Sequence, residues 1–217
     1  KEVGDERPIS TGFAVMAADL TTRTKVEFPR MSKLYWTKPS TVNPGAFVRA
    51  SMSVPFFFQP FVIDNVPRND DLKSEWSDMA GYEGDIPRRV KFVDGGILSN
   101  FPIYVFHNYK FVPRAPTFGV RLGIEREKPS YIENIVGLAK GIFRSTRHIL
   151  DYDFIAKNQE YKKLICEIDT GRHYWLNFNL NNEAKKELFA AGANAAAEFL
   201  LKFDWHEYKE LRRRLLQ

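Results

Sequence analysis

The chain has 217 residues, of which 44% are hydrophobic and 27% are charged, enough apolar material to bury one sizeable core. No apolar run approaches the roughly 20 residues that cross a bilayer, so the sequence predicts no membrane-spanning helix. The formal net charge is +5, but the basic residues are scattered and do not interleave with aromatic side chains, which argues against a nucleic-acid partner.

Short apolar runs separated by turn residues predict an alternation of strands and helices. In chain order, we expect strands at 12–18 and 25–28, a helix at 44–53, strands at 61–63 and 90–93, a helix at 100–109, a strand at 116–122, a helical stretch at 130–162, a strand around Cys166 and a helix at 182–203. Asn43 and Pro44 mark the first helix start, and Pro55 marks its end. The alternation predicts an α/β fold with a mostly parallel sheet and helices on both faces.

One aspartate stands at the end of a predicted strand and before two glycines. Residues 90–93 suit a buried strand, Asp94 follows it, and Gly95 and Gly96 permit a tight turn. In open α/β folds, ligands and catalytic groups collect at the carboxyl ends of strands. A turn aspartate that bonds its own backbone has the same local sequence, so this motif alone leaves a structural role and a functional role open.

Several segments together resemble the patatin-like phospholipase family. They are Met16-Ala17-Ala18-Asp19-Leu20-Thr21-Thr22, Ala50-Ser51-Met52-Ser53-Val54-Pro55, Asp94-Gly95-Gly96 with Asn100 and Pro102, and Leu188-Phe189-Ala190-Ala191-Gly192-Ala193-Asn194-Ala195-Ala196. The resemblance implies a three-layer fold and a serine acyl hydrolase that acts on lipid or phospholipid through a Ser-Asp dyad, without a cofactor. Carried onto this sequence, the base of the dyad is Asp94, and Gly95 and Gly96 shape its turn.

The nucleophile of that dyad is absent from this chain. No serine has glycine two positions before and two positions after it, and no Gly-Gly-Gly is present to form an oxyanion hole. The chain begins at Lys1 and enters a predicted strand almost at once. We therefore expect residues 1–217 to be the C-terminal portion of one patatin-like domain, inactive alone and able to associate with the missing N-terminal segment. The alternative is a relative without the nucleophile that only binds lipid or acts as a scaffold.

Family members usually join the strands at 61–63 and 90–93 by a short link, whereas here residues 64–89 are polar and rich in Pro and Gly. This segment is therefore expected to be a surface insertion. The single cysteine, Cys166, lies in an apolar strand pattern and is expected in the core. A chain without disulfides fits a reducing compartment, so we expect a cytoplasmic protein or one that contacts a membrane peripherally.

Other residue types that carry chemistry are better explained as structural. Ser51 and Ser53 lack flanking glycines, and Asp19 is expected to bond the backbone of Thr21 or Thr22 in its own turn. No His or Cys grouping has the spacing of zinc ligands, so no metal site is predicted. The remaining candidates are expected to be structural or exposed (His107, His148, His173 and His206), core (Phe56, Phe57 and Phe58), or a solvated helix end (Arg212, Arg213 and Arg214).

Overall fold

The computed structural model describes residues 12–99, 101–106, 110–123, 132–135, 137–138, 141–142, 145, 159–171, 173 and 177–216. The chain folds into two compact units. The N-terminal unit comprises Ser10–Pro102 with Ile132–Asp153, and the C-terminal unit comprises Lys1–Ile9, Ile103–Tyr131 and Phe154–Gln217. The candidate site residues all belong to the N-terminal unit, so that unit carries the functional argument.

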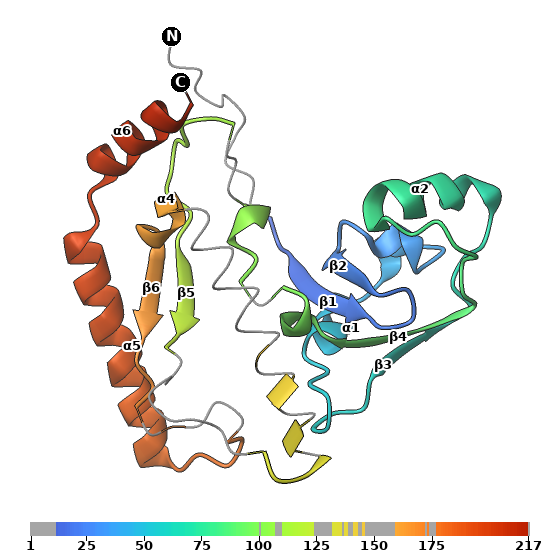
Figure 1. Cartoon of the computed structure of the whole chain (residues 1–217), viewed down its shortest axis with the longest axis horizontal. Helices are drawn as coiled ribbons and strands as arrows, with labels where there is room; N and C mark the ends of the chain where they lie inside the picture. Colours follow the sequence, from blue (N-terminus) through green and yellow to red (C-terminus); the bar gives the residue numbers. More distant parts are fainter. Residues whose placement is uncertain are drawn as a thin grey trace. The chain divides into compact units, whose positions relative to one another are not determined.

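The N-terminal unit is built on a four-stranded sheet with helices beside it (Figure 1). Its elements are β1 (Val15–Asp19), β2 (Thr24–Phe28), η1 (Ser32–Leu34), η2 (Pro39–Thr41), α1 (Pro44–Ser51), β3 (Phe61–Asp64), α2 (Asp70–Ala80), β4 (Arg89–Asp94) and η3 (Gly95–Ile97). The sheet order is β2-β1-β4-β3. The predicted strands at 12–18, 25–28, 61–63 and 90–93 and the predicted helix at 44–53 are therefore confirmed.

The direction of these strands differs from the prediction. Every pair in the four-stranded sheet is antiparallel, whereas we expected a mostly parallel sheet. β1 and β2 form a hairpin across residues 20–23, a connection too short for the crossover that parallel strands need. The helix α1 joins β2 to β3, which lie on opposite edges of the sheet, so the strand–helix–strand pattern is real but does not make parallel neighbours.

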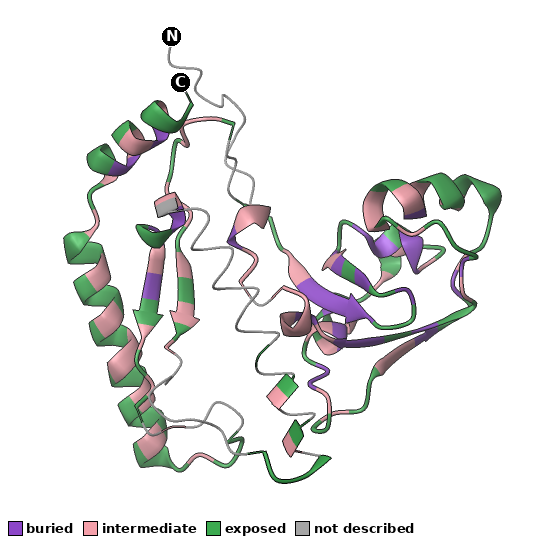
Figure 2. Ribbon diagram, in the orientation of Figure 1, coloured by how far each residue is buried: buried purple, intermediate pink, exposed green. Residues whose placement is uncertain are grey.

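Aromatic side chains form the core of the N-terminal unit. The Phe28 ring lies 4.9 Å from Phe47 of α1 and 5.7 Å from Phe92 of β4, measured between ring centroids. Trp76 of α2 is 1% exposed and packs edge-on against Tyr35 at 5.1 Å. Segment 64–89, expected to be a surface insertion, thus supplies a core side chain through α2 as well as exposed polar residues (Figure 2).

The turn after β1 is built around a buried carboxylate. Asp19 Oδ1 accepts hydrogen bonds from the backbone N–H of Thr21 at 2.8 Å and of Thr22 at 3.3 Å, as the sequence predicts. Asp19 Oδ2 accepts the Thr22 hydroxyl at 2.7 Å and the Tyr35 hydroxyl at 3.4 Å. Burial raises the pKa of Asp19 despite these hydrogen bonds, and burial together with the neighbouring carboxylate raises the pKa of Tyr35.

The C-terminal unit contains the one pair of strands in the described residues that is parallel. Its elements are η4 (Ile103–Val105), β5 (Gly119–Leu122), α4 (Gln159–Lys162), β6 (Ile165–Ile168), α5 (Asn182–Lys202) and α6 (Trp205–Leu215). β5 pairs in parallel with β6, and Cys166 is buried in β6 as predicted. The chain is thus a mixed α/β protein, with parallel pairing confirmed only for β5 and β6.

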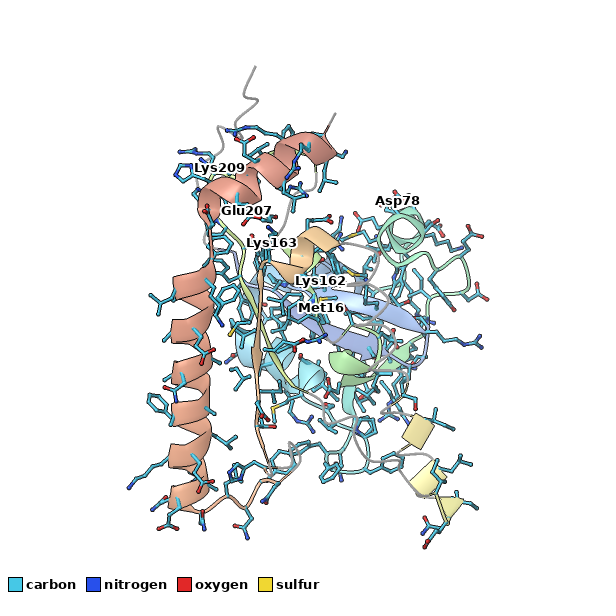
Figure 3. All side chains as sticks on the ribbon, turned by 60° about the vertical axis from the view of Figure 1, so that its left-hand side comes forward. Met16, Asp78, Lys162, Lys163, Glu207 and Lys209 are labelled. Carbon is cyan, nitrogen blue, oxygen red and sulfur yellow. The ribbon has the colours of Figure 1, made fainter. Side chains whose placement is uncertain are left out.

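The last predicted helix is confirmed as α5, and the chain then continues into a separate helix, α6. Asp204 begins α6 by accepting the Glu207 N–H at 2.9 Å. Lys163 and Glu207, both labelled in Figure 3, form an ion pair beside this helix start. The prediction that Arg212 is solvated is wrong, because Arg212 is only 2% exposed and donates to the Phe111 carbonyl oxygen at 3.2 Å.

The helix predicted at 100–109 is not reproduced by the residues of that range that the structure describes. In the expected helix at 100–109, residues 103–105 form only the short 3-10 turn η4; Pro102, which lacks an N–H, precedes it. Residues 100 and 107–109 lie outside the described residues, as does most of the predicted helical stretch at 130–162. Across the part of the chain that the structure describes, no helix is both long and apolar enough to cross a membrane.

Candidate active site

Asp94 closes β4 and begins the 3-10 turn η3, as the sequence predicts for a strand-ending aspartate before a tight turn. Its Oδ1 accepts the Gly96 N–H at 2.7 Å, so the carboxylate caps its own turn. The side chain is half-buried, and no hydrogen bond to Oδ2 occurs among the described residues. One carboxylate oxygen is therefore fixed by the turn while the second keeps lone pairs for another proton donor.

Gly95 is required because the turn passes against the backbone of β1. A Cβ added to Gly95 would lie 2.0 Å from the carbonyl oxygen of Met16, a residue labelled in Figure 3. It would also lie 2.8 Å from the Ala17 nitrogen. These are backbone atoms of a central strand, which cannot give way as a flexible side chain would. The predicted role of Gly95 in shaping the turn thus has a steric basis, and Gly96 contributes the N–H that holds the carboxylate.

The backbone of Asp94 is also tied to the end of α1. The Asp94 N–H donates to the Ser53 carbonyl oxygen at 2.9 Å. Ser53 lies just after α1 and is fully buried, and its hydroxyl donates to the Arg49 carbonyl oxygen at 2.8 Å and accepts from Arg49 Nη1. The structure therefore brings Ser53 to Asp94 through the main chain, with the serine hydroxyl engaged by Arg49. Ser51 ends α1 and is half-buried.

Arg49 was not among the residues that the sequence singled out. The signal present in the sequence was its spacing four residues before Ser53, which places both side chains on one face of a helix. Its second guanidinium nitrogen, Nη2, donates to the Gln59 carbonyl oxygen at 2.8 Å, a contact that no local pattern predicts.

The phenylalanines after α1 do not form the core that the sequence predicted. Phe56 is 71% exposed and Phe57 is 43% exposed, whereas Phe58 is half-buried. Both side chains lie in the turn that follows Val54, in which Phe56 adopts a φ of 70° and no strand or helix is formed. The expectation that these side chains are core is therefore wrong for Phe56 and Phe57.

The two described histidines belong to the C-terminal unit. His173 Nε2 contacts Glu187 Oε2 at 2.8 Å, and His206 is exposed on α6. His107 and His148 lie outside the described residues. Within the described ranges, no three His, Cys, Asp or Glu side chains are grouped closely enough to hold a metal ion.

The fold and site define a mixed α/β protein with a strand-ending aspartate held in a glycine turn. Residues 10–107 match the family model described as "Patatin-like phospholipase". This segment, which contains β1 to β4 and the Asp94 turn, is therefore similar to the patatin-like phospholipase family, as its motifs indicated.

A curated relative extends the similarity beyond the patatin-like segment. "Uncharacterized protein YqhO" of Bacillus subtilis (strain 168) is 28% identical over 188 residues, which cover 86% of this chain. The chain spans 56% of the length of that curated relative. No solved structure matches the chain.

Proposed function

We propose that this chain supplies the base of a patatin-like serine acyl hydrolase, and that Asp94 is this base. The nucleophilic serine would lie outside these 217 residues, in the complete three-layer domain. The observation that carries the proposal is the state of the Asp94 carboxylate, half-buried at the end of β4, with Oδ1 fixed by Gly96 and Oδ2 without a hydrogen bond among the described residues. A base held in one orientation at an accessible position meets the geometric requirement for proton transfer.

The reaction proceeds in two balanced steps. In the first step Asp94 accepts the proton of the serine hydroxyl, the serine oxygen bonds to the ester carbonyl carbon, and the alcohol portion of the lipid leaves with that proton. In the second step Asp94 accepts a proton from water, whose oxygen attacks the acyl-serine and releases the fatty acid, and the serine regains its proton. A carboxylate in direct contact with the serine can perform both transfers without a histidine.

The test is Asp94→Asn in the protein as the cell makes it, assayed on a short-chain nitrophenyl ester. Asn keeps an oxygen that accepts the Gly96 N–H, so the turn survives while the proton acceptor is removed. We expect kcat to fall by about 10²- to 10⁴-fold with unchanged circular dichroism, the range observed for loss of a general base. Labelling by an organophosphonate reports separately whether a nucleophilic serine is present.

The matched control is Asp64→Asn. Asp64 also ends a strand, but it is exposed and pairs with Arg89 at 3.0 Å. This variant should keep the wild-type rate. Full activity in Asp94→Asn would leave Asp94 with only its turn-capping role, and a protein with neither activity nor labelling would favour the non-catalytic lipid-binding or scaffolding relative.

A further inference from the structure

The position of Asp94 depends on a hydrogen bond from outside its own turn. Its N–H donates to the Ser53 carbonyl oxygen at 2.9 Å, and this bond joins the end of β4 to the segment that follows α1. A displacement of the Ser53 carbonyl oxygen would therefore move the backbone nitrogen of Asp94. Since the Gly95 backbone is already in contact with β1, the turn has little freedom to compensate.

The Ser53 carbonyl is itself held by a small polar cluster. The Ser53 hydroxyl donates to the Arg49 carbonyl oxygen and accepts from Arg49 Nη1, so the side chain is bonded on both sides. Arg49 Nη2 reaches the Gln59 carbonyl oxygen at 2.8 Å. One guanidinium thus bridges the end of α1 and the residues that lead into β3, on either side of the 53–59 segment.

Within this segment, the backbone N–H groups of Phe57 and Phe58 donate to the Val54 carbonyl oxygen at 3.2 and 3.0 Å. Phe56, at the centre of its turn, has a φ of 70°, a conformation that residues with a side chain rarely adopt. The Phe56 side chain itself is mostly exposed, so its own burial does not stabilise this conformation. Those two hydrogen bonds stay within residues 54–58, whereas the Arg49 bridge joins Ser53 at one end of the segment to Gln59 at the other.

We propose that Arg49, acting through Ser53, is a positioning residue for Asp94. This inference rests on the proposed function, because it assigns to the Arg49–Ser53 pair the task of holding the catalytic base in register with the nucleophile. A planar guanidinium can donate to two oxygens in fixed directions, which the single ammonium of lysine cannot do. The bridge therefore requires arginine rather than a positive charge alone.

The experiment combines kinetics with amide hydrogen exchange in the complete protein. For Arg49→Lys we expect kcat on the nitrophenyl ester to fall by about 10- to 100-fold, the cost of a small misplacement of a catalytic group. KM should change by less than about twofold, because the variant removes no substrate contact. The Asp94 N–H, followed by NMR, should exchange with solvent at least about tenfold faster.

Ser53→Ala and the double variant show whether the two residues act as one unit. Ser53→Ala keeps the carbonyl that Asp94 uses but removes the hydroxyl that Arg49 holds, so it should reproduce the loss in kcat. Arg49→Lys combined with Ser53→Ala should be no slower than the more impaired single variant, because both remove the same link. Arg88→Lys, which alters an exposed arginine bonded to Asn65 at 3.3 Å, is the control and should leave kcat and exchange unchanged.

The outcomes separate this inference from the proposed function. Full activity in Asp94→Asn overturns the proposed function, and with it the purpose assigned to the bridge. If Asp94→Asn is inactive but Arg49→Lys keeps the wild-type kcat, only the inference about the bridge is overturned. The same holds if Asp94→Asn is inactive and the Asp94 N–H of Arg49→Lys exchanges at the wild-type rate. Faster exchange along all of β4, including Phe92 and Val93, also overturns it, since Arg49 would then support the sheet in general.

Discussion

The two units of the chain differ in how their side chains are buried. In the N-terminal unit, helices and strands contribute to one cluster of buried side chains that includes Phe28, Tyr35, Phe92 and Trp76. In the C-terminal unit, the longest helix of the described residues, α5, has no buried residue, and Figure 2 shows it without a buried stretch. Phe189 and Leu201 on α5 are 80% and 88% exposed.

This difference indicates which substitutions will lower the stability of the protein. A side chain surrounded by others loses packing when it is truncated, whereas one that already faces solvent loses little. The candidate base lies in the tightly packed unit, beside the backbone of a central strand. The position of Asp94 therefore depends on the packing of that unit's core. Matched substitutions in the two units can test the comparison.

A large loss of stability is expected for Gly95→Ala. The added Cβ would meet the Met16 carbonyl at 2.0 Å, so β1 or the turn must move, at an expected cost of about 3 kcal/mol or more. The control is Gly192→Ala in α5, where the added Cβ meets only Ile168 Cδ1 at 3.7 Å. It should stabilise by about 0.5–1 kcal/mol, since alanine favours a helix over glycine. Urea denaturation of each variant measures both values, and equal changes would contradict the contrast.

A second contrast compares two large aromatic side chains. Trp76→Ala should lower the free energy of unfolding by about 3–5 kcal/mol, because it opens a cavity beside Tyr35 in the core. Phe189→Ala on α5 should change it by less than about 0.5 kcal/mol. The measurement is again urea denaturation, followed by circular dichroism. A loss above about 2 kcal/mol for Phe189→Ala would mean that α5 is packed in solution.

Local patterns predicted the elements but not how they combine. The strand before Asp94, the hairpin flanks and the first helix follow from apolar periodicity and from Asn43 and Pro44, which are local signals. Strand direction depends on which strands become neighbours, and that is decided by packing between distant segments. The sequence therefore predicted α/β content correctly and a mostly parallel sheet incorrectly.

The same division applies to the site. Asp94 and Gly95 stand in a contiguous motif, so their turn was predictable from the sequence. The link from Arg49 through Ser53 to Asp94 joins residues far apart in the chain, and only the fold brings them together. Burial of Arg212 was missed for a similar reason, because the Phe111 carbonyl that accepts its hydrogen bond is remote in sequence.

Two aspartates that bond nearby backbone N–H groups show the contrast between the units in electrostatic terms. Asp19 accepts from Thr21 and Thr22 but is fully buried, and burial raises its pKa. Asp204 accepts from Glu207 at the start of α6 and is exposed, and this hydrogen bond lowers its pKa. The same kind of interaction therefore accompanies opposite shifts, because desolvation outweighs the hydrogen bonds at Asp19, whereas the Glu207 hydrogen bond outweighs desolvation at Asp204.

Opposite shifts predict opposite pH dependences of stability. Between the unfolded pKa of Asp19, near 3.8, and its raised folded pKa, the folded state binds more protons. The free energy of unfolding of the wild type minus that of Asp19→Asn should thus fall as the pH rises from about 4. The slope of this difference should be at most about 1.4 kcal/mol per pH unit. For Asp204 the folded pKa lies lower, so wild type relative to Asp204→Asn should lose stability as the pH falls below about 4. Urea denaturation of the three proteins from pH 3 to 7 measures both differences, and slopes of the same sign would show that burial does not dominate at Asp19.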